Sequence, residues 1–323
     1  MKAALHALVV VLALVAGGIV HAQAYPNKPV RVMVGYAPGG GVDLAARLVA
    51  SALSELWGST ALVDNRPGAA GGVATEITAK AIPDGYTLML CQIASHAITP
   101  ARSKNLPYDH IRDFAFVSMI GSTPNVFVVH PSLPTKSLGE FIAYARANPG
   151  KINFGSSGVG ASPHLSIELL KTMTGIDIVH VPYKGAALAL ADVMGGQIPA
   201  SVGNLPGGML AAIKAGRVRA LGVTAAKRSA RVPDVPTFAE AGVPGYDVSS
   251  WYGICTQAAV PQPILAKLNA DLIRVLNSPE LQQRMEEQGI DVTPSTAEQF
   301  LAHVKSETAK WAKVVKDAGL AAE

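Results

Sequence analysis

Charge is scarce in this chain. Asp, Glu, Lys and Arg make up 15% of its 323 residues, and the formal net charge is +4. No run of Lys and Arg marks a surface for nucleic acid, so we expect no nucleic-acid partner. Beyond residue 24, no apolar run reaches the roughly 18 residues that indicate a membrane-spanning helix. The low charge excludes a disordered chain, and the length corresponds to about two ordinary domains.

Cysteine is also rare. The chain has only Cys91 and Cys255, and it lacks C-x-x-C and H-E-x-x-H patterns. Two separated cysteines without paired histidines do not predict a zinc site, and we expect neither a metal nor a cofactor. Both cysteines lie in apolar, strand-like segments. A disulfide of an exported protein and a pair of buried thiols fit that setting equally well, and the sequence leaves both open.

The first 24 residues have the pattern of a secretory signal peptide. Lys2 precedes an apolar run over residues 7–20, and a small-x-small sequence ends at Ala24. The run is shorter than the roughly 20 apolar residues of a membrane span. We expect cleavage between Ala24 and Tyr25 and an exported, soluble mature protein. The alternative is an uncleaved N-terminal anchor.

Strand-like and helix-like segments alternate along the remaining chain. Expected strands lie at residues 30–36, 60–63, 86–91, 117–120 and 126–129, with others up to residue 224. Between the first of them, residues 42–56 have apolar side chains at helical spacing. This β-α-β-α order predicts parallel sheets with helices on both faces. Its repetition predicts two α/β lobes, joined by short strand segments.

Two glycine-rich loops leave the ends of expected strands and enter helices, at Gly39–Gly41 and at Ser156–Ser162. Such a loop exposes backbone N–H groups at the positive end of a helix dipole, where anions bind. Neither loop has the G-x-x-x-x-G-K-[ST] or G-x-G-x-x-G pattern of nucleotide sites. A neutral cradle of amides and hydroxyls suits a carboxylate instead. A plain strand-to-helix turn is the alternative for each loop alone.

A secreted serine hydrolase acting through Ser157 or Ser162 is the main alternative function. The sequence does not favour it, because Val159 occupies the position of the second glycine in G-x-S-x-G. His164 follows on the same loop and helix, whereas a triad usually draws its base from elsewhere. Ser162 also fits a helix N-cap in front of Pro163.

Four other residues are candidates for the site. Asp43 either caps the helix after the first glycine loop or contacts a ligand, and both roles are compatible. His96 follows a strand and lines the cleft or lies in the core. Tyr36, beside the first loop, and Trp251 are placed to stack on a flat ligand. Core packing is the alternative for Trp251.

Several motifs follow one another in order along the mature chain. They are Tyr36-Ala37-Pro38-Gly39-Gly40-Gly41-Val42-Asp43, Asp64-Asn65-Arg66-Pro67-Gly68-Ala69-Ala70-Gly71-Gly72, Pro83-Asp84-Gly85-Tyr86, Asn153-Phe154-Gly155-Ser156-Ser157-Gly158-Val159-Gly160, Val181-Pro182-Tyr183-Lys184-Gly185 and Ser250-Trp251-Tyr252-Gly253. In combination they resemble the Bug-type (TctC-like) periplasmic receptors of tripartite tricarboxylate transporters.

The resemblance implies an α/β, two-lobed, Venus-flytrap fold like that of periplasmic binding proteins, with a mixed, mainly parallel sheet in each lobe. The expected lobes are residues 25–125 with 247–323, and residues 126–246. It implies a periplasmic, non-enzymatic, monomeric receptor. Its ligand would be a tricarboxylate, dicarboxylate, acidic amino acid or aromatic acid, and its partners the membrane subunits of the transporter. A sensory receptor that docks on a signalling protein is an alternative with the same fold.

The same resemblance places the ligand's carboxylate between the two loops, held by backbone amides. The resulting candidate ligand-binding residues are Tyr36, Pro38, Gly39, Gly40, Gly41, Asp43, Ser95, His96, Ser156, Ser157, Gly158, Gly160, Ala161, Ser162, His164, Asn204 and Trp251. This chain departs from the family at Gly203, where the usual residue is larger, and we expect a wider pocket floor there. The glycine loops contain no Lys or Arg, so they offer no cation to a second acidic group.

Overall fold

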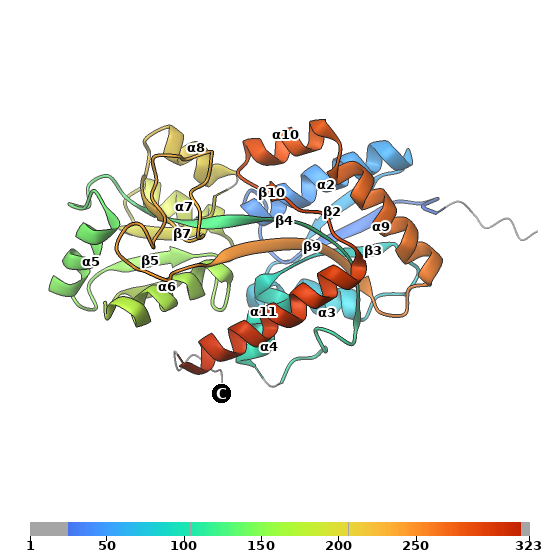
Figure 1. Cartoon of the computed structure of the whole chain (residues 1–323), viewed down its shortest axis with the longest axis horizontal. Coiled ribbons are helices and arrows are strands. Elements are labelled where there is room, and N and C mark those ends of the chain that lie inside the picture. Colours follow the sequence, from blue (N-terminus) through green and yellow to red (C-terminus); the bar gives the residue numbers. More distant parts are fainter. Residues whose placement is uncertain (1–24, 104, 206, 318–323) are drawn as a thin grey trace, which may run out of the picture.

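The computed structural model describes residues 25–103, 105–205 and 207–317 (Figure 1). The signal peptide expected at residues 1–24, and with it Ala24, lies outside these ranges, so the cleavage site stays a prediction. Tyr25 is the first described residue. Its hydroxyl donates to the carbonyl of Gly85 at 2.6 Å, and its ring packs edge-on against Trp57 and Tyr86.

The first lobe begins with the predicted β-α-β-α-β unit. Its strands are β1 (Val30–Val34), β2 (Ala61–Asn65) and β3 (Thr87–Gln92), and its helices are α2 (Gly41–Trp57) and α3 (Gly72–Ala79), with a short 3-10 turn η1 (Ala69–Gly71) before α3. β1 pairs in parallel with both β2 and β3. The apolar stripe of α2, including Val49 and Leu53, is buried against this sheet. After β3 come a π-helical turn, η2 (Ala94–Ile98), and α4 (Thr99–Arg102).

Two long antiparallel strands carry the chain between the lobes. β4 (Phe114–Val129) and β9 (Ser249–Gln257) pair from Phe114–Gln257 to Pro124–Ser249 and run side by side in Figure 1. The two strands expected at 117–120 and 126–129 are therefore one. The polar residues between them stay in the strand because they find partners: Thr123 Oγ1 donates to the carbonyl of Gly289 at 2.8 Å, and Asn125 belongs to a buried network described below.

The second lobe repeats the alternation. Its strands are β5 (Asn153–Ser156), β6 (Val179–Pro182), β7 (Ala200–Asn204) and β8 (Arg219–Val223), and its helices are α5 (Leu138–Ala147), α6 (Ser162–Thr174), α7 (Ala186–Met194) and α8 (Gly208–Lys214). β5 pairs in parallel with β6 and β7, while β7 and β8 pair antiparallel with β4.

The described strands form one mixed path in the order β2-β1-β3-β9-β4-β7-β5-β6, with β8 and β10 (Asp291–Val292) attached to β4. Parallel pairs lie toward both ends of the path and antiparallel pairs in its middle. The expected two-lobed α/β fold is confirmed. The lobe boundary expected at 125/126 falls inside β4, and the boundaries stay a proposal.

The C-terminal helices return to the first lobe (Figure 1). They are α9 (Gln262–Leu276), α10 (Pro279–Glu287) and α11 (Ala297–Asp317). Leu268 and Leu272 of α9 join the core beneath α2, and Trp311 of α11 is fully buried. Among the described helices, none is both long and apolar enough to cross a membrane.

Candidate functional site

The first glycine loop ends at the N-terminus of α2. Gly40 precedes the helix and offers no side-chain cap, so the first backbone N–H groups of α2 have no partner within the helix. Asp43 holds the loop in place, because its carboxylate accepts the N–H of Gly39 at 3.0 Å. It does so from the first turn of α2 and not as an N-cap, which was one of its two expected roles.

The charge of Asp43 is compensated. Its carboxylate accepts hydrogen bonds from Arg47 Nε and Asn65 Nδ2, both at 2.9 Å. Burial raises the pKa of Asp43, but the hydrogen bonds from Arg47, Gly39 and Asn65 outweigh this and hold it below its usual range. The negative charge of Asp43 is thus compensated by Arg47 and Asn65, and the loop's other amides remain free.

The second glycine loop is shaped by two histidines. Ser156 Oγ lies 2.6 Å from His180 Nε2, and the N–H of Gly160 donates to His164 Nδ1 at 3.1 Å. The rings of His164 and His180 stack with centroids 3.9 Å apart. Burial lowers the pKa of His164 to about 3 and that of His180 to about 4, and nearby positive groups add to this. Both rings are therefore neutral near pH 7, and the loop carries no positive side chain.

Both loops line one cavity between the lobes, as expected. Its lining residues are Tyr36, Ala37, Gly40, Gly41, Val42, Gln92, Ser157, Pro163, Ala186 and Asn204. A second, adjoining cavity shares four of them and adds Gly39, Ala187, Leu190, Gly208 and Met209. None of these lining residues is Lys, Arg, Asp or Glu. The first turns of α2, α6 and α7 all reach the main cavity.

The N-terminus of α7 is the part of the site that the sequence analysis missed. Ala186, its first residue, lines both cavities. The signal was present, because Gly185 ends one of the family motifs and directly precedes this helix. Gln92, at the end of β3, was missed as well, although a polar residue at a strand end is a recognisable signal.

The lobes are closed on one another around this cavity. The N–H of Ala37 donates to the carbonyl of Lys184 at 3.3 Å. On the other side, a Cβ at Gly160 would lie 2.5 Å from Nη1 of Arg102. The cavity volume is about 10 Å³, which is room for about one water and far below the roughly 300 Å³ of a small ligand pocket.

Only part of the predicted set touches these cavities. Tyr36, Gly40, Gly41, Ser157 and Asn204 line the main cavity and Gly39 the adjoining one, whereas Pro38, Asp43, Ser95, His96, Ser156, Gly158, Gly160, Ala161, Ser162, His164 and Trp251 are not among the lining residues. Among the latter, Asp43 and His164 support the loops from behind.

The prediction that His96 and Trp251 contact the ligand is wrong, because both side chains lie in the core. The His96 ring is fully buried and packs edge-on against Phe114 and Phe116. Trp251 is 2% exposed, packs against Phe300 and donates to Glu307 Oε2 at 3.3 Å. A ligand in the cleft cannot stack on either ring.

Ser95 and Gly203 also differ from expectation. Ser95 is fully buried, and its hydroxyl contacts the carbonyl of Gln92 and the ring of His96. A Cβ at Gly203 would lie 3.1 Å from the Met209 side chain and 3.2 Å from that of Ala186. Gly203 therefore lets these two helix starts pack tightly onto β7 and does not widen the pocket.

Ser162 belongs to a buried polar network instead of capping α6. Its hydroxyl accepts from Asn125 Nδ2 at 3.1 Å and lies 2.9 Å from Ser250 Oγ. Asn204 Nδ2 donates to Asn125 Oδ1 at 2.8 Å and to Ser250 Oγ at 2.9 Å. The network joins β4, α6, β7 and β9 where the chain crosses between the lobes, and it sets the orientation of Asn204.

The hydroxyls proposed for a hydrolase are poorly arranged for attack. Within the second glycine loop, the serine that contacts a histidine is Ser156, which is fully buried and does not line the cavity. Ser162 is held in the network by Asn125 and Ser250. For Ser157, which does line the cavity, no histidine contact occurs within the described part of the chain.

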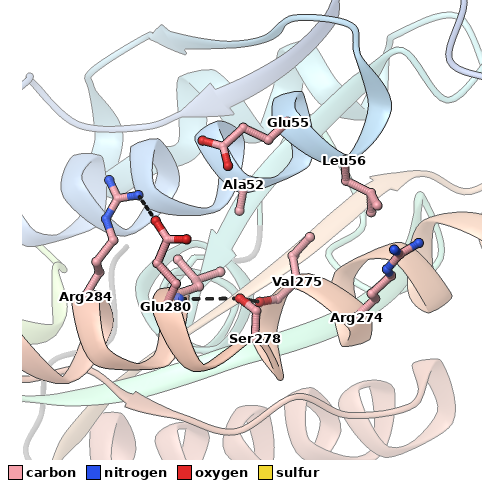
Figure 2. A pocket seen from close by; sticks show the side chains of 9 residues that line it. Ala52, Glu55, Leu56, Arg274, Val275, Ser278, Glu280 and Arg284 are labelled. Carbon is pink, nitrogen blue, oxygen red and sulfur yellow. Dashed lines mark hydrogen bonds and ion pairs between the residues drawn. The ribbon is translucent and has the colours of Figure 1, made fainter.

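Larger cavities lie elsewhere but lack these features. One of about 450 Å³ is bordered by α2, α9 and α10 (Figure 2). Its wall carries two acidic and two basic side chains, Glu55, Glu280, Arg274 and Arg284, and Glu280 lies 3.9 Å from Arg284. Another, of about 570 Å³, lies between the start of β4, α9 and α11. Neither touches a glycine loop.

Comparison with known proteins identifies the family of this chain. Residues 45–320 match the family model described as "Tripartite tricarboxylate transporter family receptor". The chain belongs to this receptor family. It is 35% identical over 301 residues to protein BugT of Bordetella pertussis, covering 93% of this chain and 92% of BugT.

Several solved structures superpose closely on the chain. The R. palustris protein Rpa4515 with adipate is 38% identical, with a TM-score of 0.88, over 91% of this chain and 98% of that one. MatC from Rhodopseudomonas palustris with bound malate is 31% identical, with a TM-score of 0.85, over 90% and 100%. The periplasmic binding protein BugD has a TM-score of 0.89 at 31% identity, over 93% and 100%.

Proposed function

We propose that this chain is a periplasmic receptor that captures a small organic carboxylate between its lobes and delivers it to a tripartite tricarboxylate transporter. The observation that carries the proposal is the meeting of the first turns of α2, α6 and α7 at one cavity lined by no charged side chain. Helix N-termini offer free N–H groups and a positive partial charge, which suit a carboxylate.

The absence of a basic side chain among the cavity residues limits the ligand. Its acid group is held by amides such as those of Gly41 and Val42 and by the Ser157 hydroxyl. The negative charge of the nearby Asp43 does not oppose it, because Asp43 is already paired with Arg47. This arrangement favours a carboxylate over a phosphate ester, which usually recruits Arg or Lys. Adipate and malate, the ligands in two of the similar solved structures, are both dicarboxylates and belong to the class proposed here.

Asn204 is proposed to contact a part of the ligand beyond its carboxylate. Both of its amide hydrogens are donated inside the network, to Asn125 and Ser250. Its Oδ1 is therefore the atom that it offers to the cavity, and this oxygen can only accept. A ligand carrying a hydroxyl or ammonium group near its carboxylate would satisfy it.

A thermal unfolding screen of residues 25–323 tests the proposal. The panel holds tricarboxylates, dicarboxylates, acidic amino acids and aromatic acids. A ligand at a hundredfold excess over its Kd stabilises the folded chain by about 2.7 kcal/mol, which raises the Tm by several degrees. No shift with any of the four classes would overturn the proposal. Loss of uptake of the identified acid in cells lacking this receptor then tests delivery to a transporter.

A further inference from the structure

A cluster of metal-ligating side chains lies outside the cleft. The fold brings Cys91 of β3, His96 of η2 and Cys255 of β9 together, with one ligand atom from each lying within 4.8 Å of the others. All three residues are fully buried, and both cysteines are free thiols. We expected no metal site because the two cysteines are far apart along the chain. The fold brings them close together in space.

The strand register explains the meeting of the two sulfurs. β3 and β9 are antiparallel, with Cys91 opposite Gly253 and Cys255 opposite Met89. Cys91 and Cys255 are thus diagonal neighbours on one face of the sheet. The Cβ atoms of such neighbours lie about 7 Å apart or slightly less. A disulfide needs Cβ atoms about 3.8 Å apart. The register favours a bridging ion between the sulfurs over a direct S–S bond.

The ring of His96 is oriented to complete the cluster. Its Nε2 lies 3.7 Å from Cys255 Sγ, and its Nδ1 lies 2.9 Å from Ser95 Oγ. Ser95 donates its own hydrogen to the carbonyl of Gln92 at 3.2 Å and so can accept the Nδ1 hydrogen. This places the free lone pair of His96 on Nε2, facing the sulfur. Ligating histidines typically show this arrangement, with the second ring nitrogen held by an outer partner.

We propose that Cys91, His96 and Cys255 form a buried binding site for one thiophilic metal ion, Zn²⁺ or Cu⁺. Thiolate and imidazole ligands select these ions over Mg²⁺ and Ca²⁺. With metal bonds of about 2.3 Å to sulfur and 2.0 Å to nitrogen, an angle of about 120° separates the two ligand atoms by about 3.7 Å. That matches the observed distance between Cys255 and His96.

The surroundings of the cluster suit such an ion. Met89 lies directly opposite Cys255 on the same face and adds a second kind of soft sulfur. Binding releases the thiol protons, and Zn²⁺ with two thiolates leaves no net charge in the core. Thr308 of α11 contacts the carbonyl of His96 at 3.2 Å, so α11 covers the site. The ion would be acquired during folding.

The test uses residues 25–323, reduced, stripped of metal in denaturant with a chelator, and refolded with Zn²⁺, Cu⁺ under anaerobic conditions, or Mg²⁺. Elemental analysis after gel filtration measures the retained metal. We expect about one Zn²⁺ or Cu⁺ per chain and no Mg²⁺. The Cys91→Ser/Cys255→Ser variant should lose it. His303→Asn is the matched control, because this half-buried α11 histidine packs on Trp251 outside the cluster and should keep the metal.

X-ray absorption of the wild-type chain provides a second measurement that needs no variant to fold. A first shell of two sulfurs and one nitrogen supports the site. The proposal is overturned if the reduced chain retains neither ion, if the double cysteine variant retains as much as the wild type, or if the protein isolated from the periplasm carries a Cys91–Cys255 disulfide.

Discussion

Ala37 and Lys184 are hydrogen-bonded to each other across the cleft, with the N–H of Ala37 donating to the Lys184 carbonyl at 3.3 Å. The backbones approach closely here, since a Cβ at Gly185 would lie only 3.1 Å from that of Ala37. The cavity behind this contact has a volume of about 10 Å³. A ligand of several carbon atoms can reach it only if the lobes separate, which breaks the bond.

The exchange of the Ala37 amide should therefore report closure. We expect its hydrogen exchange to quicken by at least tenfold in saturating ligand, because the cavity of about 10 Å³ in this closed form does not hold such a ligand and the bond stays broken while it is bound. Amide NMR or fragment-resolved exchange measures this. The amide of Val32, in the middle of β1, serves as the control and should not change. Equal exchange of the Ala37 amide with and without ligand would exclude a separation of the lobes on binding.

Gly40→Val tests whether the amides at the start of α2 hold the ligand. A Cβ at Gly40 meets no atom within 4 Å, so the protein should fold, but the added side chain fills the space in front of these amides. We expect the Kd to rise by at least tenfold, about 1.4 kcal/mol. Gly139→Val, at an equally open position in the first turn of α5, should leave the Kd unchanged. Equal affinities would place the site elsewhere.

Gly158 is a poorer test position than Gly40. Its φ is +132°, which L residues rarely adopt, and a Cβ there would lie 3.2 Å from the carbonyl oxygen of Tyr183. Gly158→Val should lower the free energy of unfolding as well as weaken binding. Urea denaturation measures the first effect, and an unchanged midpoint would contradict the strain inferred here.

The stacked histidines predict how stability depends on pH. An unfolded histidine has a pKa near 6.5, whereas the pKa of His164 in the folded chain is lowered to about 3. Between these values only the unfolded chain takes up the proton, so the free energy of unfolding falls as the pH falls below 6.5. One such histidine contributes at most about 1.4 kcal/mol per pH unit.

His164→Asn should make this fall shallower. The Asn Oδ1 can still accept the Gly160 N–H but does not titrate. Urea denaturation of both proteins from pH 7 to pH 4 measures the two slopes. Identical slopes would mean that His164 is not kept neutral by the fold.

The network at the crossover predicts a stability difference between two buried serines. Ser250 contacts Asn125, Ser162 and Asn204, whereas Ser201 makes one hydrogen bond, to the carbonyl of Gly155 at 3.2 Å. Removing Ser250 leaves buried partners unpaired, and each unpaired group lowers the free energy of unfolding by about 1 kcal/mol or more. We expect Ser250→Ala to lower the free energy of unfolding by about 2 kcal/mol more than Ser201→Ala. Equal losses would show that the network contributes no extra stability.

The sequence predicted local structure better than it predicted long-range contacts. Periodicity located the helix around 42–56, and the ordered motifs identified the family. Polar residues such as Thr123 and Asn125 hid the continuity of β4, because the partners that keep them in a strand come from distant segments. The same limit concealed the role of α7 at the cleft.

Single residues were hardest to place where two environments fit one residue type. His96 follows a strand end as a ligand residue would, but η2 turns its ring inward between Phe114 and Phe116. For the same reason, spacing along the chain could not reveal that Cys91 and Cys255 are neighbours. Only the pairing of β3 with β9 brings them together.

Isothermal titration of residues 25–323 with dicarboxylates, adipate and malate among them, and with the matching dimethyl esters tests the central claim most directly. If neutral helix N-termini at the cavity bind the acid group, at least one acid binds saturably with one site per chain. Its ester then binds at least a hundredfold more weakly, a difference of about 2.7 kcal/mol. An ester that binds as tightly as its acid would contradict the account, as would the absence of saturable binding by every acid.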